Sequence, residues 1–241
     1  MGENNLNDDG YKDALIKAIN EDDPSLQPTH VLIEDYLEAE KKAQTDMLTG
    51  LPNDRRFAAD LKHIISTGER DLAFFFIDVN NLKEFNDQDQ THALGDYIIV
   101  RTADLLRENT AIQTDLKYRF GKGDEFVIIS RGVKSDKHMK KIGQRLVDVF
   151  LGGHDKEKKL RPTVCIGGIW IGSKALDEDV RAAIFGADKA MYEAKQQANE
   201  AKRIHQGIKP SRFVAYDEQR HGLLRTLMRS PRTELAAFAG K

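Results

Sequence analysis

The sequence predicts an α/β (α+β) domain with a split βαββαβ core, in which a mostly antiparallel sheet is flanked by helices. Leu72–Asp78 (L-A-F-F-F-I-D) is an unbroken apolar run too short for a typical helix, which indicates a strand buried on both faces. Within Lys117–Ser130, two β-prone runs flank a tight Gly-Lys-Gly-Asp turn, which predicts a hairpin. From Leu72 onward the segments follow one another as strand, helix, strand, strand, helix and strand.

Length and composition favour one sizeable domain with extensions, or two small domains at most. The chain has 241 residues, of which 40% are hydrophobic and 32% charged, as expected of a soluble globular protein. Its 37 basic and 39 acidic residues give no support for nucleic-acid binding. The single cysteine, Cys165, excludes an internal disulfide framework and favours a cytoplasmic protein. The acidic, polar start and the lack of a long apolar run predict neither a signal peptide nor a membrane span.

We expect three parts along the chain. Residues 1–45 form an N-terminal extension with a helix over Thr29–Thr45, where strong helix formers recur at helical spacing. This helix is either a signalling or dimer-forming stalk or a helix packed on its own domain, and the residues favour neither. Residues 46–218 form the main domain, and residues 219–241 form a tail that we expect to be solvated.

In the main domain, Thr49-Gly50 and Pro52 interrupt the first helix, and Asn53 can cap a second helix that runs to about Thr67. The residues that follow Asp78 are expected to form a polar loop. The other expected elements are helices over Leu94–Asn109, Lys134–Leu151 and Asp177–Ala198, strands over Pro162–Ile171 and Phe213–Tyr216, and a charged loop over His154–Leu160.

Carboxylates and glycines gather where the hairpin tip is expected to meet the first strand. In the βαββαβ order the third strand lies between the first and second, so Asp78 and Asp124 should face each other across one shallow cleft. Gly121 and Gly123 let a phosphate approach the backbone amides, and Asp124 and Glu125 are suited to hold a divalent metal ion. The alternative is a solvated hairpin beside an aspartate that merely ends a strand, because glycine and aspartate are common in turns.

The polar loop after Asp78 carries groups that could recognise a nucleotide base. Asn86 and Asp96 could together read a purine edge, Asn86 through its amide and Asp96 by accepting from ring N–H and amino donors. The alternative is a loop that caps the next helix, with Asp96 in its acidic first turn. His92 is more often structural at such a position, and no second histidine or cysteine lies nearby in the sequence to form a zinc site.

Six motifs occur in order along the chain: D-M-L-T-G-L-P-N, D-V-N-N-L-K-E-F-N-D, T-H-A-L-G-D, R-F-G-K-G-D-E-F, C-I-G-G and A-D-K-A-M-Y-E-A-K. Any one of them is a weak signal, whereas their common order and spacing are specific. Through these motifs the chain resembles the GGDEF family of diguanylate cyclase domains. The resemblance covers Asp46–Glu218, which is most of the chain.

The resemblance implies a ferredoxin-like fold, similar to the palm of nucleotide polymerases. It also implies an enzyme that condenses two GTP molecules into cyclic di-GMP and releases pyrophosphate. Each domain of this family holds one GTP, so turnover implies a homodimer in which two domains meet face to face. The implied cofactor is Mg²⁺ or Mn²⁺, with two ions for each GTP site.

The resemblance also implies roles for individual residues. Asp78 and the Val79 carbonyl would bind metal, and Glu125 would help to hold the second ion. Asp124 would bind metal and act as the base on the attacking 3′-hydroxyl, in an in-line displacement at the α-phosphorus. Asn86 and Asp96 would bind the guanine of the substrate, with His92 nearby. Lys83 and Lys195 would bind its phosphates. The substrate would also contact Gly121, Lys122 and Gly123 in the hairpin turn.

The sequence departs from the family pattern in the nucleotide site. Lys122 is inserted between the two signature glycines, where it either adds a phosphate contact or shifts the carboxylates. The loop D-Q-D-Q-T-H-A-L-G-D is one residue longer than is usual in the family. Asn199 replaces the usual phosphate-binding arginine, and Lys202, Arg203 or Lys209 could take its place.

The inhibitory site of the family is degenerate in this chain. The product-inhibition motif R-x-x-D reads I-Q-T-D, so Asp115 is present but Ile112 stands where arginine would bind a phosphate. We therefore expect no product inhibition through this site.

Three functions are compatible with these motifs. An active, metal-dependent diguanylate cyclase is favoured, because all the carboxylates and both guanine-reading residues are present. A non-catalytic GGDEF-like domain could instead bind GTP or a cyclic dinucleotide as a receptor. A related cyclic-dinucleotide synthase with another base preference is the third, because the lengthened loop permits a change in base recognition. No phosphodiesterase motif accompanies the domain in this sequence.

Overall fold

The computed structural model describes residues 27–88, 92–111, 114–121, 123–152, 162–172, 177–205 and 209–217. The chain divides into two compact units, Met1–Gln44 and Thr45–Lys241. The predictions made for residues 1–26, for the charged loop over residues 154–160 and for the tail over residues 219–241 lie outside the described residues.

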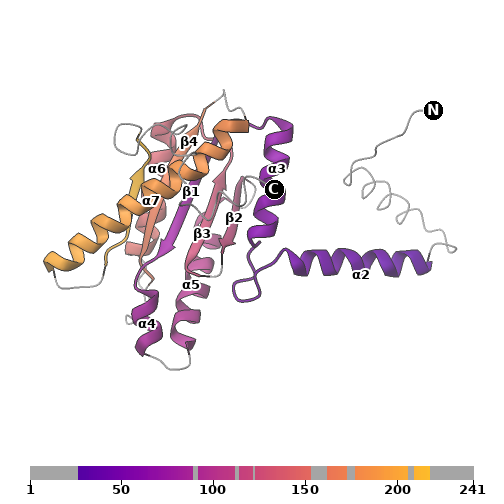
Figure 1. The fold of residues 1–241 in the computed structure, drawn as a ribbon, viewed down its shortest axis with the longest axis horizontal. Coiled ribbons are helices and arrows are strands. Elements are labelled where there is room, and N and C mark those ends of the chain that lie inside the picture. Colours follow the sequence, from indigo (N-terminus) through magenta and orange to yellow (C-terminus); the bar gives the residue numbers. More distant parts are fainter. Residues whose placement is uncertain are drawn as a thin grey trace. The chain divides into compact units, whose positions relative to one another are not determined.

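The larger unit is built on one five-stranded sheet with the strand order β2-β3-β1-β4-β5 (Figure 1). β3 pairs antiparallel with both β1 and β2, β4 pairs antiparallel with β1, and β5 joins β4 in parallel. This confirms the βαββαβ order and the predicted place of the second hairpin strand, β3, between β1 and β2. The strands are β1 (Leu72–Val79), β2 (Asp115–Phe120), β3 (Glu125–Ser130), β4 (Val164–Ile171) and β5 (Arg212–Ala215).

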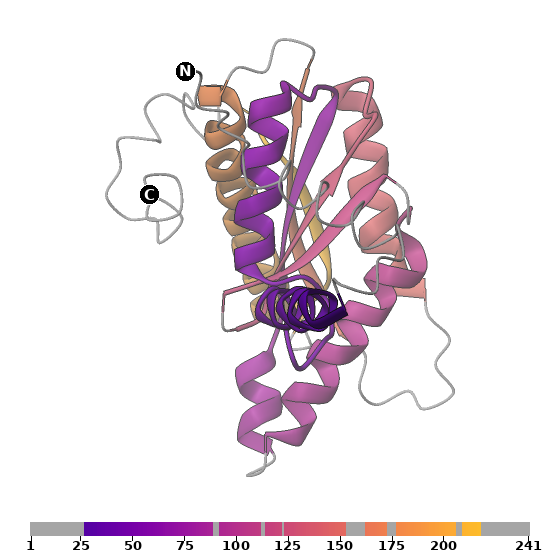
Figure 2. The same ribbon diagram turned by 90° about the vertical axis from the view of Figure 1, so that its right-hand side faces the viewer.

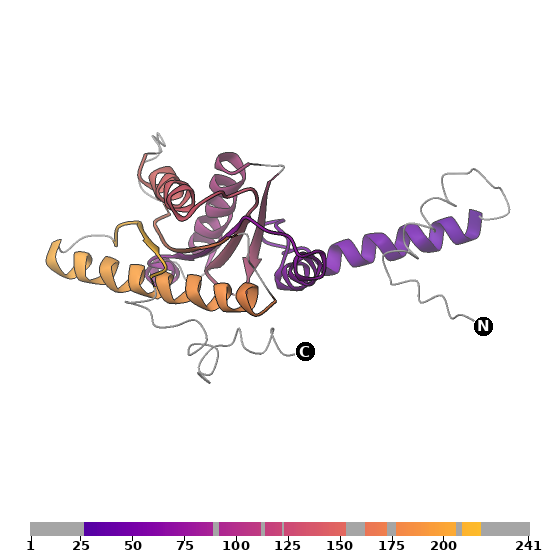
Figure 3. The ribbon, with the colours of Figure 1, turned by 90° about the horizontal axis from the view of Figure 1, so that it is seen from above.

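Four long helices cover the two faces of this sheet (Figures 2 and 3). On one face, α5 (Ala93–Asn109) and α6 (Asp136–Gly152) pack against Phe75 and Ile77 of β1. On the other face, α3 (Asp54–Thr67) and α7 (Asp177–His205) pack against Phe74 and Phe76. Every residue of β1 is buried, which confirms the prediction of a strand covered on both sides.

The polar segment after β1 contains a short helix, α4 (Leu82–Gln88), where the sequence predicted only a loop. Leu82 and Phe85, three residues apart, pack against the core and supply the apolar side that helix formation needs. Charged and amide residues surround Leu82 and Phe85 in the sequence, so the segment shows no clear helical spacing of apolar residues. α7 also extends beyond the predicted end at Ala198 and reaches His205, because no glycine or proline interrupts N-E-A-K-R-I-H.

The local signals at α3 are confirmed. The side chain of Asn53 accepts hydrogen bonds from the backbone amides of Arg55 and Arg56, as an N-cap does. At the other end, Gly68 adopts the left-handed conformation, with φ 62°, and its amide bonds back to the last turn. These caps set where α3 begins and ends relative to the sheet.

The smaller unit contains α2 (Gln27–Ala43), which confirms a helix in the predicted region. Glu38 and Lys42 form an exposed i,i+4 ion pair of 2.8 Å on it. Whether this helix serves as a stalk or packs on its own domain stays a prediction. Over the described residues, no helix is both long enough and apolar enough to cross a membrane.

Candidate functional site

The ends of β1 and β3 meet as the topology predicts. Asp78 is directly opposite Glu125 in the β1–β3 register. One residue further on, the amide of Val79 donates a hydrogen bond of 2.9 Å to the carbonyl of Asp124. Backbone pairing therefore brings Asp78 to the neighbours Asp124 and Glu125, which follow it by more than 40 positions in the sequence, at one end of the sheet.

Asp78 is the buried member of this group. Its side chain is only 2% exposed and forms an ion pair with Lys195 of α7, with 2.5 Å between Oδ2 and Nζ. Burial raises the pKa of Asp78 to about 7, and the charges of Asp124 and Glu125 act in the same direction, while Lys195 opposes them. Burial disfavours the charge of Lys195, but the attraction of Asp78 outweighs it and raises the lysine pKa. The site therefore holds an excess of negative charge.

The donor set of this group suits a hard divalent cation. Mg²⁺ and Mn²⁺ prefer oxygen ligands, and Asp78, Asp124, Glu125 and the carbonyl of Val79 offer only oxygen. Oδ2 of Asp78 is buried and already contacts one cationic group, the ammonium of Lys195, so this carboxylate lies where a positive charge is stabilised. In the described ranges, no three Asp, Glu, His or Cys side chains are already grouped as a metal site. The residues thus fit the ion chemically, with Lys195 as the present neighbour of Asp78.

A polar layer lies next to Asp78 at the start of β4 and β5. Cys165 pairs with Asp78 in the sheet, and its thiol donates a 3.2 Å hydrogen bond to Oδ1 of Asn80. The amide of Asn80 donates to the carbonyl of Pro210, just before β5, at 3.4 Å. Burial raises the pKa of Cys165 to about 11, and the charges of Lys195 and Lys209 oppose this rise. Lys209 therefore lies at the same end of the sheet as the carboxylates.

The predicted base-reading residues lie on α4 and α5, which run side by side beyond this end of the sheet (Figure 1). Asn86 of α4 is half-buried, and Oδ1 of its side chain has no hydrogen-bond partner in the described segments. Asp96 lies in the first turn of α5 and is exposed, as are His92 and Lys83. His92 is the N-cap residue of α5, with φ 59°, but its side chain makes no capping hydrogen bond. Asp96 therefore lies in the acidic first turn that the alternative to base recognition predicts, and its role at the guanine stays a prediction.

The structure places the hairpin residues only in part. Gly121 is exposed with φ 64°, a left-handed conformation that favours glycine, and a Cβ on it would lie 3.8 Å from Oε2 of Glu125. Gly123 follows in the turn, with open space around its Cα. Lys122 lies outside the described residues, so its effect on the carboxylates stays a prediction.

The degenerate inhibitory motif is likewise described in part. Asp115 is buried at the start of β2, where its carboxylate accepts a 2.8 Å hydrogen bond from the amide of Ala111. Ile112 lies outside the described residues. Asp115 thus has a structural contact of its own at the start of β2.

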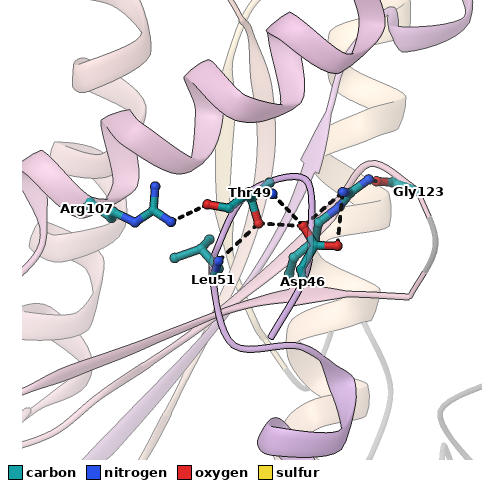
Figure 4. Close-up of polar contacts among 6 residues, drawn as sticks. Asp46, Thr49, Leu51, Arg107 and Gly123 are labelled. Carbon is teal, nitrogen blue, oxygen red and sulfur yellow. Dashed lines mark hydrogen bonds and ion pairs between the residues drawn. The ribbon is translucent and has the colours of Figure 1, made fainter. Parts of the chain in front are cut away.

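Arg119 ties the hairpin tip to the segment before α3, a link that the sequence analysis missed (Figure 4). Its guanidinium contacts Oδ1 of Asp46 at 3.0 Å and donates to the carbonyl of Gly123 at 2.9 Å. Thr49 donates to the same Asp46 oxygen from both its amide and its hydroxyl. Burial disfavours the charge of Asp46, but these contacts outweigh it and lower the pKa of the carboxyl. The sequence signal for this link is the D-M-L-T motif, in which Asp46 and Thr49 are three residues apart.

The same segment is also fixed from α5. Arg107 donates from its guanidinium to the carbonyl of Thr49. Gly50 next to it has φ 66°, and a Cβ on it would lie 3.4 Å from Nη2 of Arg107. The turn after Asp46 is therefore in contact with both the hairpin and the helix that carries Asp96.

Arg119→Ala is expected to lower the free energy of unfolding by about 1–3 kcal/mol, because Asp46 would remain partly buried without its ion pair. Chemical denaturation of the purified variant measures this loss. Combining it with Asp46→Asn should give clearly less than the sum of the two single effects. Arg101→Ala, which breaks a more exposed pair with Glu108, is the control and should change stability by less than about 0.5 kcal/mol. Additive effects of the two substitutions would contradict this coupling.

The candidate substitutes for the missing arginine differ in their surroundings. Asn199 is exposed on α7. Lys202 forms an ion pair with Glu84 of α4, and Arg203 pairs with Glu200 on its own helix at 2.6 Å. Lys209 forms no ion pair within the described ranges. Of the three candidates, Lys209 is thus the cation left available at the carboxylate end of the sheet.

The fold and the site define a palm-like α/β domain with acidic residues at the joined strand ends. The sequence matches the family model described as "Diguanylate cyclase, GGDEF domain" over residues 43–201. The chain belongs to the GGDEF family.

Individual relatives agree with this assignment. The chain is 32% identical over 170 residues to the diguanylate cyclase TpbB of Pseudomonas aeruginosa (strain UCBPP-PA14), which covers 68% of this chain and 38% of the relative. It is 35% identical over 100 residues to the diguanylate cyclase DgcS of Shewanella oneidensis, which covers 40% of this chain and 33% of the relative. The chain therefore spans well under half the length of these relatives.

Solved structures show the same fold. The GGDEF domain of TpbB from Pseudomonas aeruginosa superposes with a TM-score of 0.57 at 26% identity, over 77% of this chain and 99% of that one. The coiled coil and GGDEF domain of DgcB from Caulobacter crescentus, solved in complex with c-di-GMP, gives a TM-score of 0.59 at 21% identity, over 83% and 98%. At that lower identity the likeness supports the fold alone.

Proposed function

We propose that this protein is a metal-dependent diguanylate cyclase, which joins two GTP molecules into cyclic di-GMP and releases pyrophosphate. The observation that carries the proposal is the meeting of Asp78, Asp124 and Glu125, with Lys195, at the joined ends of β1 and β3. Membership in the GGDEF family and the names of the relatives support it. GTP as substrate also agrees with the cytoplasmic location expected from the single cysteine.

The residues of this chain would divide the binding of GTP between them. Asn86 and Asp96 read the guanine, with His92 nearby. Lys83 and Lys195 neutralise the phosphates, with the amides of Gly121 and Gly123 and the inserted Lys122 beside them. Because Lys195 is held by Asp78 in the structure, its partner changes when triphosphate is present. The ion pair with Asp78 keeps Lys195 charged and close to the site until it contacts the phosphate.

The reaction balances as two in-line displacements. The 3′-hydroxyl oxygen of each GTP attacks the α-phosphorus of the other, so two P–O bonds form and two pyrophosphate groups leave. Asp124 takes the proton of the attacking hydroxyl. Two Mg²⁺ or Mn²⁺ ions for each GTP, held by Asp78, the Val79 carbonyl, Asp124 and Glu125, would supply positive charge to the reacting phosphates. One GTP is held by each domain, so the active form is a homodimer.

The test is the product formed by the full chain from GTP, ATP or both, with Mg²⁺ or Mn²⁺, identified by mass spectrometry. Cyclic di-GMP from GTP alone, absent from an Asp124→Ala control, is the expected result. No cyclic dinucleotide above that control would overturn the proposal. GTP binding in that sample would then support a receptor function, whereas incorporation of labelled ATP would indicate a synthase with another base preference.

Lys209 is expected to bind phosphate in place of the arginine that Asn199 replaces. Lys209→Ala should lower kcat/KM for GTP about three- to tenfold, because one cationic contact to phosphate is lost. Steady-state release of pyrophosphate measures the change. Arg203→Ala is the matched control, because that side chain is exposed and already paired with Glu200. Equal effects of the two substitutions would contradict a special role for Lys209.

Product inhibition through the R-x-x-D site is expected to be absent, because Ile112 cannot form the fork of hydrogen bonds that arginine makes with phosphate. At saturating GTP, initial rates should therefore stay constant as cyclic di-GMP is added at increasing concentration. Ile112→Arg should create inhibition, since Asp115 of the motif is retained. Inhibition of the unaltered protein with the same concentration dependence as the variant would show the prediction to be wrong.

A further inference from the structure

Gly95 of α5 lies directly against the side chain of Asn86 of α4. A Cβ built on Gly95 would lie 1.9 Å from Oδ1 of Asn86, 2.8 Å from its Cγ and 3.2 Å from its Nδ2. Real Cβ atoms do not approach other atoms so closely. Any side chain at position 95 must therefore displace the carboxamide of Asn86 or push the two helices apart.

The backbone does not require glycine at this position. Gly95 lies within α5, and it is not among the glycines with positive φ, which are Gly50, Gly68, Gly121 and Gly132. In an ordinary helical conformation glycine is less favourable than alanine, because it loses more backbone entropy on folding. The helix would therefore be more stable with alanine here if Asn86 were absent. The space that glycine leaves is the feature to be explained.

Packing, rather than hydrogen bonding, holds the Asn86 carboxamide. Oδ1 is buried, yet no residue in the described part of the chain donates a hydrogen bond to it. Buried polar atoms without a partner are uncommon, and they mark places where a polar side chain is kept for another purpose. Asp96, the residue after Gly95, is exposed on the first turn of the same helix.

We propose that Gly95 is a positioning residue for base recognition. The space over its Cα forms a seat, in which the Asn86 carboxamide lies. In this way α5 positions both groups that contact the guanine: it holds Asn86 in the seat, and it carries Asp96 itself. The seat holds Asn86 in one orientation before GTP arrives and reduces the loss of side-chain freedom on binding. This inference rests on the proposed function, because it concerns how the same site selects its base.

The test uses the full chain with Mg²⁺ and the α,β-methylene analogues of GTP and ATP, which cannot react at the bond that is normally cleaved. Gly95→Ala should weaken binding of the GTP analogue about tenfold, the worth of one hydrogen bond to the base, and leave weak binding of the ATP analogue unchanged. In an Asn86→Ala background the same change should not weaken binding further. In that background it should raise Tm by about 2–4 °C, because alanine then gains helix stability without a collision.

Gly143→Ala in α6 is the matched control. A Cβ there would collide with the ring of Phe213 of β5, at 2.3 Å, and not with Asn86. Gly143→Ala should lower Tm without changing the affinity for the GTP analogue. This control therefore separates the general effect of overpacking from the specific loss of the seat for Asn86. Binding unaffected by Gly95→Ala, although Asn86→Ala weakens it, would overturn the inference. An equal loss in the Asn86→Ala background would also overturn it, because Gly95 would then act through another group.

The failure of the proposed function has a different signature. If Asn86→Ala itself left binding of the GTP analogue unchanged, Asn86 would not read the base, and the guanine-binding part of the proposed function would fail. The rise in Tm on adding Gly95→Ala to Asn86→Ala would still report whether the seat exists. The two failures are therefore distinguishable.

Discussion

Asp78→Asn should lower cyclic di-GMP synthesis about 10²- to 10³-fold, while the protein remains folded. Asparagine keeps the shape of the side chain but removes the charge that would hold a cation and that now pairs with Lys195. Loss of one preorganised electrostatic group at a reacting centre has effects of this size. The variant also leaves Lys195 without its carboxylate partner, so the lysine is less firmly placed for the phosphates. The rate of pyrophosphate release, with circular dichroism as the test of folding, measures the effect.

The opposite end of the same strand supplies a matched control. Asp71 precedes β1 and pairs with Lys134 at 2.9 Å, so it repeats the aspartate–lysine pair in an exposed setting. Its φ of 58° is one that asparagine tolerates well. Asp71→Asn should leave the rate within about twofold of the original, since exposed pairs contribute little. Activity of Asp78→Asn equal to that of Asp71→Asn would contradict the assigned role of Asp78.

Gly167→Val should prevent folding or lower the free energy of unfolding by more than about 4 kcal/mol. A Cβ on Gly167 would lie 2.0 Å from the carbonyl oxygen of Ala187 and 2.1 Å from the amide nitrogen of Met191. These are backbone atoms of α7, so the whole helix would have to move away from β4. Because α7 also carries Lys195, any folded fraction should show reduced activity. Urea denaturation and soluble yield measure the effect.

The neighbouring Gly168 shows that the cost of an added Cβ depends on whether it collides with backbone or with side-chain atoms. The three atoms nearest to a Cβ on Gly168 would be side-chain atoms of Phe213, Met139 and Phe75, at 2.8 to 3.0 Å. Side chains can rotate and a helix backbone cannot, so Gly168→Ala should cost about 1–3 kcal/mol. Equal losses for Gly167→Ala and Gly168→Ala would show that α7 is not held against β4 as closely as described.

The elements that the sequence analysis predicted well are those with strong local patterns. The apolar run of β1 and the turn between β2 and β3 fix the pairing of Asp78 with Glu125 once the βαββαβ order is recognised. Asn53 was identified as a cap from its type and position alone. α4 was missed because two apolar residues, Leu82 and Phe85, are too few to reveal a helical period.

Side-chain contacts between distant segments were beyond prediction. Arg119 and Asp46 are 73 positions apart. Nothing in either segment indicates that the Arg119 guanidinium contacts both Asp46 and the carbonyl of Gly123. The contact of Gly95 with Asn86 depends on the angle at which α4 meets α5, which sequence periodicity does not determine. The engagement of Lys195 by Asp78 likewise follows from how α7 lies on the sheet.

The central claim is that the joined ends of β1 and β3 form one cation and nucleotide site. Binding of Mn²⁺ to the full chain, followed by electron paramagnetic resonance with the α,β-methylene analogue of GTP present, tests it most directly. We predict Mn²⁺ binding that is weakened at least about tenfold by Asp78→Asn and by Asp124→Asn, and unchanged by Asp71→Asn. Mn²⁺ binding of equal strength in all four proteins would contradict the claim.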